Sequence, residues 1–530
     1  MDTKALRQKI LDLAIRGKLV PQNPNDEPAS VLLERIRQQK QQMVKEGKLK
    51  PKDIKNDSVI FVGEDNLHYE KFADGSVKCI EDEIPFELPE SWAWARLQSF
   101  VNFIGGSQPP KSTFEYVATK DNIRLIQIRD YKTDKFLTYI PKSLARRFCS
   151  KGDVMIGRYG PPIFQVLRGL EGSYNVALMK AVSEPGIMLN DYLFYLLQDG
   201  ELLKMLESLS DRTCGQDGIN MYELNRYIVG IPPLDEQNRI TQYLISVLPI
   251  VDNIASNKAE LESLITQTKA KILDLAIRGQ FVPQDPNDEP ASVLLERIRA
   301  EKEELIKQGK IKRDKKKSVI FRGEDNSYYE KVGSDVICID AEIPFEIPDT
   351  WEWMRLESCC VKEIRRGKSP KYVDESGTLV FAQKCNTKYG GIDMGLALFL
   401  DESTLGRYPD DEYMQDGDVV INSTGTGTLG RVGLFRVTDN QLGLPIVPDS
   451  HVTVIRAAHS IQSVYVYGFM KANQSKLEKK GEGSTNQKEL KPPTLKEMLI
   501  PIPPYFEQER IVAAITAAFS TISAIEKSLN

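Results

Sequence analysis

The stretch KILDLAIRGKLVPQNPNDEPASVLLERIR, residues 9–37, returns at residues 271–299 as KILDLAIRGQFVPQDPNDEPASVLLERIR. Farther along each copy, EIPFELPESWAWARL (83–97) returns as EIPFEIPDTWEWMRL (342–356). Repetition of this extent determines the architecture and is established before any motif is interpreted. The chain is therefore built from one structural unit that is written twice.

A shorter element is also repeated: IPPLDEQNRI at 231–240 corresponds to IPPYFEQERI at 502–511. Between the repeats lie two segments, about 98–230 and about 357–501, whose sequences barely match. The chain begins in one repeated element and ends in the other, so it is a circularly permuted pair. This order predicts a pseudo-twofold arrangement, because closed twofold symmetry is the commonest solution for paired units.

The centre of the chain predicts a long helix. Apolar residues recur at spacings of three, four and seven between Asp235 and Gly279, which is the stripe of an amphipathic or coiled-coil helix. Continuous helix over this range spans roughly 65 Å, and Pro249 is expected to kink or break it. The same stripe recurs at 511–525 and at 6–13, which predicts that these two terminal segments form its antiparallel partner. In the repeated segment, Asn25 or Asp26 is the expected N-cap of the following helix.

Composition excludes several classes of protein. The 530 residues are too many for one core, and the 41% hydrophobic and 27% charged content is that of a globular protein. We find no apolar run that approaches a membrane span and no secretory signal. The seven cysteines and three histidines show no ligand spacing, which fits a reducing cytoplasm. The net charge of −5 argues against wholesale polybasic DNA binding but permits a local basic groove.

The two variable segments share a scaffold despite their divergence. KGDVMIGRYG (151–160) parallels DGDVVINSTG (416–425), and each is followed by further strand patterns and a helical stretch. We expect an α/β (α+β) fold with two globular domains joined by long antiparallel coiled-coil-like helices. The expected segments are a repeated helical region, a first variable domain, a central repeated region with the long helix, a second variable domain and a C-terminal helix, at 1–97, 98–230, 231–356, 357–501 and 502–530.

The repeated NDEPASVLLERI run, the IP-x-x-W-x-W-x-x-L start of each variable segment and the IPPLDEQNRI that follows it resemble the specificity subunit of type I restriction–modification systems. The resemblance covers essentially the whole chain. It implies that each variable segment is a target recognition domain for one half of a split, asymmetric DNA target. It also implies a spacer that sets the half-sites about one duplex turn, roughly 34 Å, apart. The implied partners are two modification (methyltransferase) subunits and two restriction (motor–nuclease) subunits. S-adenosylmethionine, ATP and Mg²⁺ would be bound by those partners, and no cofactor by this chain.

Candidate DNA-binding residues come from the basic, amide and aromatic side chains of the variable segments, because Arg and Lys neutralise phosphates while Arg, Gln and Asn pair with base edges. In the first segment the candidates are Lys111, Arg124, Gln127, Arg129, Tyr131, Lys132, Arg158, Tyr159, Gln216 and Asn220. In the second segment they are Arg365, Arg366, Lys368, Lys371, Tyr372, Gln383, Lys384, Asn386, Lys388, Asn422, Thr424, Thr426, Thr428, Arg431, Asn486 and Gln487.

Two alternatives belong to other classes, a self-sufficient DNA methyltransferase or nuclease, and a coiled-coil adaptor between proteins. GTGTLG (425–430) matches a dinucleotide-binding pattern, but the RVGLFRV that follows predicts a strand rather than a helix. We therefore expect a hairpin-type loop there, no catalytic or metal site, and a non-enzymatic, cytoplasmic subunit of bacteria or archaea. Trp92, Trp94, Trp351 and Trp353 are expected to anchor each variable domain to the frame.

Overall fold

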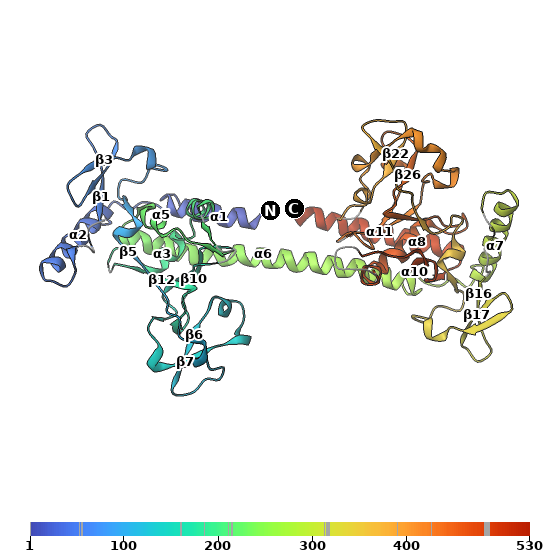
Figure 1. The fold of residues 1–530 in the computed structure, drawn as a ribbon, viewed down its shortest axis with the longest axis horizontal. Coiled ribbons are helices and arrows are strands. Elements are labelled where there is room, and N and C mark those ends of the chain that lie inside the picture. Colours follow the sequence, from blue (N-terminus) through green and yellow to red (C-terminus); the bar gives the residue numbers. More distant parts are fainter. Residues whose placement is uncertain are drawn as a thin grey trace. The chain divides into compact units, whose positions relative to one another are not determined.

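The structure is a computed structural model that describes residues 2–51, 54, 57–159, 162–184, 186–209, 211–213, 216–311, 313, 318–388, 391–425, 427–481 and 488–529, without the side chains of 211–213, 216 and 217. It divides into two compact units, Met1–Lys258 and Ala259–Asn530. Each unit contains one copy of the repeated frame and one variable segment (Figure 1).

The first unit contains six helices within the described residues: α1 (Thr3–Ile15), α2 (Ala29–Lys45), α3 (Asn190–Leu196), α4 (Gly200–Ser208), α5 (Met221–Arg226) and the first part of α6 (Leu234–Ile277). Its strands are β1 (Ser58–Val62), β2 (His68–Phe72), β3 (Val77–Cys79), β4 (Ala93–Arg96), β5 (Val101–Gly105), β6 (Asn122–Ile126), β7 (Tyr139–Pro141), β8 (Phe148–Cys149), β9 (Val154–Gly157), β10 (Gln165–Arg168), β11 (Gly172–Tyr174), β12 (Leu178–Ser183), β13 (Asp211–Thr213), β14 (Gln216–Gly218) and β15 (Ile228–Ile231).

The sheets of this unit separate frame from variable segment. The frame contributes the three-stranded meander β1-β2-β3, while the variable segment contributes two four-stranded sheets, β10-β9-β12-β5 and β7-β6-β11-β8. The first of these sheets shares a core with the frame, in which Ile156 and Leu193 pack with Leu11, Trp92 and Ile240. The second sheet has small cores of its own. The variable segment is thus a distal lobe on a base that is continuous with the frame.

Helices α1 and α6 run antiparallel in the first unit (Figure 1). Arg7 donates to Asp252 at 3.1 Å, and farther along the chain Gln22 donates to Glu236 at 2.7 Å. From one contact to the next, the residue number rises in the N-terminal segment and falls in α6, as expected for antiparallel segments. The apolar periodicity predicted this pairing, and the structure confirms it within the unit.

The second unit repeats this plan. Its helices are the last part of α6, α7 (Ala291–Lys307), α8 (Ser463–Ala472), α9 (Gln474–Lys479), α10 (Pro492–Lys496) and α11 (Tyr505–Leu529). Its strands are β16 (Ser318–Arg322), β17 (Tyr328–Val332), β18 (Asp335–Cys338), β19 (Glu352–Arg355), β20 (Arg365–Arg366), β21 (Tyr372–Val373), β22 (Leu379–Phe381), β23 (Leu398–Leu400), β24 (Val419–Asn422), β25 (Val432–Leu434), β26 (Ile446–Pro448), β27 (Val452–Ile455) and β28 (Leu499–Ile502).

The frame contacts of the first unit recur in the second at equivalent positions. Gln284 donates to Glu507 at 2.5 Å, as Gln22 does to Glu236. Arg510 donates to Asp288 at 2.5 Å, as Arg239 does to Asp26 at 2.6 Å. Lys269 pairs with Glu526 at 2.8 Å, so α11 lies antiparallel to the last part of α6. The predicted pairing of the two terminal helices with each other joins different units and stays a prediction.

Each variable segment leaves and rejoins its frame through a pair of strands. β4 pairs antiparallel with β15 in the first unit, and β19 pairs with β28 in the second. The strand β15 extends across the predicted boundary at residue 230, and β28 crosses the one at 501. All four tryptophans beside these junctions are buried, which confirms them as packing anchors.

One local expectation was wrong. Helix α2 begins after Pro28 without a side-chain cap, because the carboxylate of Asp26 is instead held by Arg239. Pro249 was expected to kink or break α6, and the helix continues through it without a break. At the other end of α2, Gly47 follows the helix at φ +70°, a conformation that favours glycine.

Helix α11 is long and apolar enough, by length and composition alone, to cross a membrane. This differs from the expectation that no stretch comes near such a span. Helices packed in protein cores satisfy the same criterion, and Ile511 and Ile515 of α11 are buried in the core of the second unit. Near the end of the helix, Glu526 is paired with Lys269. Only 17% of the apolar window of α11 is buried in the structure.

The buried carboxyl of Glu507 predicts a pH-dependent stability. It accepts hydrogen bonds from Trp351 Nε1 at 2.9 Å and from Gln284, but burial outweighs them and raises its pKa above the ordinary value of 4.5. Because the pKa of Glu507 is higher in the folded state than in the unfolded state, its contribution to the free energy of unfolding is complete below pH 4.5. That contribution is lost as the pH rises through the folded-state pKa. Glu507→Gln should remove this pH-dependent loss of stability. Thermal unfolding from pH 4 to 7 tests this, with exposed Glu509→Gln as the control, and parallel curves for Glu507→Gln and the native chain would contradict it.

Candidate nucleic-acid interface

Six candidate residues of the second variable segment form one polar network. It joins the turn Gln383–Cys385 to the end of β24 and the β24–β25 hairpin. Asn422 Nδ2 donates to the backbone oxygen of Gln383 at 3.0 Å, and Asn386 Nδ2 donates to Asn422 Oδ1 at 3.2 Å. Arg431 Nη1 donates to the backbone oxygen of Asn386 at 2.7 Å. Thr428 and Thr424 complete the network, since Thr428 Oγ1 is 3.4 Å from Gln383 Oε1 and 3.1 Å from the Thr424 carbonyl oxygen. The fold therefore brings together candidate residues that are far apart in sequence.

The members of this network differ in burial. Asn386 and Asn422 are 1% and 0% exposed, so their amides orient the turn and the hairpin from inside the fold. Gln383 is half-buried, while Lys384 and Lys388 are exposed. The buried amides are positioned to support a surface, and the exposed side chains are positioned to form it.

One residue of this surface, His451, was missed by the sequence analysis. His451 Nδ1 lies 2.6 Å from Thr424 Oγ1. Its backbone N–H donates to Asp449 at 2.7 Å, and burial raises the pKa of Asp449. A lone histidine in a loop carries no periodic or spacing signal, so only the fold places it beside the β24–β25 hairpin. That hairpin is the antiparallel pair β24–β25, as expected for GTGTLG.

The basic candidates on β20 and just before β21 are already paired with acidic side chains. Arg366 pairs with Glu489 at 2.7 Å, and Lys371 pairs with Asp401 at 2.7 Å. The hydrogen bond from Lys371 is the main reason that the pKa of Asp401 is lowered to about 2. The remaining candidates in this region are Arg365, paired with Asp411 and Glu412, Lys368, which lies over the Tyr408 ring, and Tyr372, which is exposed. Phosphate binding by these cations requires exchange of their carboxylate partners.

The candidates of the first variable segment lie around β6 in the distal sheet. Gln127 Nε2 and Arg129 Nη2 both donate to Thr138 Oγ1, at 2.9 and 3.1 Å. Arg124 pairs with Asp130 at 3.3 Å. Tyr131 packs against a small core, and burial raises the pKa of its phenol. The hydroxyl of Tyr131 therefore points into the protein, unlike the exposed side chains of Lys111 and Lys132.

The remaining candidates of this segment lie near β9 and α5. The guanidinium of Arg158 lies 5.3 Å from the ring centre of Tyr159, which is exposed. Asn220 caps α5 by accepting from the backbone N–H of Tyr222 at 3.1 Å. Four candidates of the two segments lie outside the residues or side chains that the structure describes: Gln216, Thr426, Asn486 and Gln487.

Several exposed aromatic side chains of the distal sheet were missed. Tyr116, Phe136 and Phe148 are exposed, and Arg146 and Arg147 are exposed beside Phe148. Aromatic residues in strand-like segments are usually packed, which is why the pattern did not select them. Exposed aromatic and basic side chains together suit contacts to nucleic acid. Within the described residues, no group of three His, Cys, Asp or Glu side chains is placed to hold a metal ion.

Comparison with known proteins identifies relatives of one kind. The family described as type I restriction modification DNA specificity domain matches residues 348–530. The type I restriction enzyme EcoAI specificity subunit of Escherichia coli is 31% identical over 413 residues, which cover 67% of this chain and 62% of that subunit. The EcoEI specificity subunit of Escherichia coli is 26% identical over 613 aligned positions, which cover 99% of this chain and 90% of that subunit.

The fold agrees with these relatives. A solved chain from a study of complex assembly and conformational transition of the type I R-M system has a TM-score of 0.50 and 17% identity, and the match covers 84% of this chain and 94% of that chain. The present chain spans a little less than two thirds of the EcoAI subunit but most of the EcoEI subunit. With the duplicated frame and the two unlike variable segments, these matches assign the chain to the family of type I restriction–modification specificity subunits.

Proposed function

We propose that the chain is the DNA-reading subunit of a type I restriction–modification complex. Each variable segment reads one half of a split, asymmetric target, and the frame holds the modification subunits in place. The observation that carries this proposal is the attachment of two unlike segments to frames with the same contacts, because equal attachment with unequal surfaces suits two different readers. The relatives named above support it.

The base-reading surface of the second segment consists of the exposed side chains over the polar network. In this proposal Gln383, Lys384, Thr424 and His451 face the groove of the DNA, because amide, hydroxyl and imidazole groups pair with base edges. Asn386 and Asn422 hold these residues in position from inside the fold. In the first segment Arg129 and the Arg158–Tyr159 pair take the equivalent part.

The chemistry belongs to other subunits. The proposed partners are two modification subunits, which bind S-adenosylmethionine, and two motor–nuclease subunits, which use ATP and Mg²⁺. This chain binds none of these cofactors and catalyses no reaction. The complex acts on double-stranded DNA in the cytoplasm.

Mapping of methylated adenines tests the proposal. DNA modified by this chain together with its modification subunit should carry methyl groups at one bipartite, non-palindromic sequence. Modification subunit alone is the control and should leave that sequence unmodified. Methyl transfer by the purified chain alone would support the enzyme alternative, and absence of DNA binding in the assembled complex would support the adaptor.

Arg366 provides a test of phosphate contact. Arg366→Ala should weaken DNA binding by the assembled complex about three- to tenfold and should reduce the slope of log K against log salt by about one. The matched variant Glu489→Gln removes the carboxylate that pairs with Arg366 and should strengthen binding. Fluorescence anisotropy at several salt concentrations measures both effects. Slopes unchanged in both variants would place Arg366 outside the interface.

A further inference from the structure

The three-stranded meander of each frame presents one face to solvent, and that face is the same in both units. In the first unit the register aligns Phe61 with Tyr69 and Tyr69 with Cys79. The neighbouring row on the same face aligns Val59, Lys71 and Val77. At the equivalent positions of the second unit the residues are again Phe, Tyr, Cys, Val, Lys and Val: Phe321, Tyr329, Cys338, Val319, Lys331 and Val336. We call these six positions the outer face.

The opposite face of the meander has diverged in part; its centre packs on the protein, while Val62, Lys78 and their counterparts Arg322 and Ile337 are exposed. Ser58, Ile60 and Glu70 are retained as Ser318, Ile320 and Glu330, and the last two pack or pair beneath the sheet. Four other positions differ: Val62 is Arg322, His68 is Tyr328, Phe72 is Val332 and Lys78 is Ile337. The sequences of the two copies have therefore diverged at these four positions. Exposed positions usually diverge first, and the exposed pairs Val62/Arg322 and Lys78/Ile337 have done so. Identity at all six positions of the outer face therefore indicates a constraint that acts on that face.

The outer face is apolar and structurally ordered. The rings of Phe61 and Tyr69 stack with centres 5.9 Å apart, and Tyr69 donates to Asp65 at 2.7 Å. In the second unit the same ring distance is 5.9 Å, and Tyr329 donates to Asp325 at 2.8 Å. Phe61 is 41% exposed and Phe321 38%, while Val77 and Val336 are 53% and 54% exposed. Stacked aromatics and valines left in solvent are typical of a contact surface rather than of a free edge.

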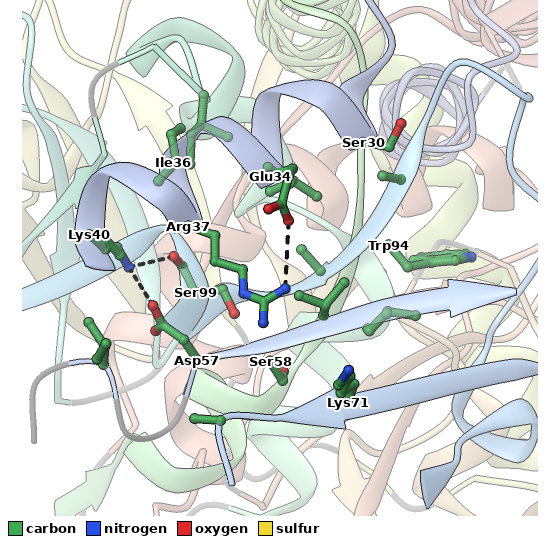
Figure 2. Close-up of a pocket in the computed structure, with 18 of the residues that line it drawn as sticks. Ser30, Glu34, Ile36, Arg37, Lys40, Asp57, Ser58, Lys71, Trp94 and Ser99 are labelled. Carbon is green, nitrogen blue, oxygen red and sulfur yellow. Dashed lines mark hydrogen bonds and ion pairs between the residues drawn. The ribbon is translucent and has the colours of Figure 1, made fainter. Parts of the chain in front are cut away.

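A groove beside the outer face is repeated as well. In the first unit a cavity of about 220 Å³ lies between α2, β1 and β4, and Figure 2 shows Lys40 at one end, bonded to Asp57 and Ser99. The second unit has the equivalent groove along α7 and β16. The two linings overlap in part, and the shared residues Ser30, Glu34 and Arg37 correspond to Ser292, Glu296 and Arg299. Lys40, Asp57 and Ser99 line only the first groove, and Arg322, Tyr328 and Trp351 line only the second. The two grooves differ at one equivalent lining position, where Ala93 of the first unit is replaced by Glu352 in the second.

Charge decides what kind of molecule fits this surface. Residues 58–83 contain seven acidic and two basic side chains, and residues 318–342 contain six and two. Glu70 and Glu330 are among the acidic ones, but they pair with Arg96 and Arg355 on the inner face, and the other acidic residues remain in excess over the basic ones. The β1–β2 turn carries Glu64 and Asp65, which recur as Glu324 and Asp325. Such a rim repels DNA phosphates and attracts basic side chains. The complementary molecule is a protein surface with an apolar centre and a basic rim.

We propose that the outer face and its groove form a docking surface for a protein partner that is bound in two identical copies, one on each unit. Identical exposed residues on both units are maintained because both contact the same molecule. This inference rests on the proposed function, in which that partner is the modification subunit, and it locates the partner's contact on the meander, away from the variable segments.

The test uses the full chain with purified modification subunit, with copies counted by native mass spectrometry. The native chain should bind two copies. Phe61→Glu should bind one copy at native affinity and the other about thirtyfold more weakly, and Phe61→Glu combined with Phe321→Glu should weaken both. The matched control is Val62→Glu, which is exposed beside Phe61 at a position that is not shared between the units. Unchanged thermal unfolding of each variant shows that the fold is intact.

A second measurement does not depend on variants. Cys79 and Cys338 are exposed on the outer face, so a maleimide should label both in the free chain, and the modification subunit should protect both. Protection by DNA instead, native affinity in the double Phe variant, or two-copy pairing of the chain with itself through this face would overturn the inference. Failure of the native chain to bind the modification subunit at all would overturn the proposed function, which distinguishes the two.

Discussion

A chain that carries residues 356–498 in place of residues 97–227, so that both frames hold the second variable segment, should direct methylation to a target whose two halves are copies of one half-site. The original half-site that residues 97–227 read should disappear from the target, while the other half should be retained. Each mismatched base pair costs about 1–3 kcal/mol, so three mismatches in the lost half should weaken binding to the original target by about 3–9 kcal/mol.

The strand pairs at the base of each variable segment make this exchange possible. In the first unit Arg96 is aligned with Ile228, and in the second Arg355 is aligned with Leu499. The ends of both segments are thus held at neighbouring positions in a two-stranded sheet. The exchange should keep β4 and β15 whole, because a cut at residue 230 would divide β15.

The frame also presents matching packing partners to either segment. Leu11, Trp92 and Ile240 pack against the first segment, and their equivalents Leu273, Trp351 and Ile511 occupy the core of the second unit. Sequencing of methylated adenines measures the outcome, with the native chain as the control. A change in both halves of the target would contradict independent reading by the two segments. An unchanged target would show that residues 97–227 do not take part in target recognition.

The second large effect is expected for Arg96→Met, which should destabilise the first unit by about 3–5 kcal/mol. Arg96 is 4% exposed and Glu70 is 1% exposed. Arg96 donates to Glu70 at 2.7 Å, to Glu83 at 2.7 Å and to the backbone oxygen of Arg226 at 2.8 Å. It therefore joins the meander, β4 and the end of α5, and its removal leaves the carboxylate of Glu70 buried without a counter-ion.

The pH dependence of this variant follows from Glu70. Burial opposes ionisation of Glu70, but hydrogen bonds from Arg96 and Ser58 outweigh it and lower its pKa in the native chain. In the native chain this stabilisation is present above the ordinary pKa of 4.5 and is lost as the pH falls. Without Arg96, Glu70 keeps the hydrogen bond from Ser58 but loses its main counter-ion, so burial favours its protonated form more strongly than in the native chain. The difference in stability between the variant and the native chain should therefore become smaller towards acid pH.

Two further variants make this prediction specific. Arg96→Met combined with Glu70→Met should recover most of the lost stability, because it removes the unpaired charge as well. Arg355→Met in the second unit should cost less, since Arg355 and Glu330 have side chains 15% and 12% exposed, and water can partly replace the arginine. Urea unfolding measures all three. Equal losses for Arg96→Met and the double variant would show that lost packing, rather than a buried unpaired charge, is responsible.

The sequence by itself determined the frame. The repeats at 9–37 and 271–299 predicted two equivalent units, and the apolar stripe between Asp235 and Gly279 predicted the long helix and its antiparallel partners within each unit. The repeat is found by comparing the two copies directly. The apolar stripe is a local pattern, and its period of three to four residues indicates which face of the helix is buried. The buried tryptophans followed from the same comparison, because they stand at identical places in both copies.

Only the tertiary structure decided which polar residues form the candidate interface. Asn386 and Asn422 have the chemistry of base readers, but contacts between η10 (Gln383–Cys385) and β24, which are distant in sequence, bury both and leave Gln383 and Lys384 at the surface. His451 meets Thr424 only because β27 pairs with β24. The burial of a side chain depends on what other segments pack over it, and a loop sequence without periodicity carries no record of those neighbours. The outer face of the meander likewise becomes apparent only from the strand register. No single strand sequence shows that Phe61 is aligned with Tyr69, or Tyr69 with Cys79.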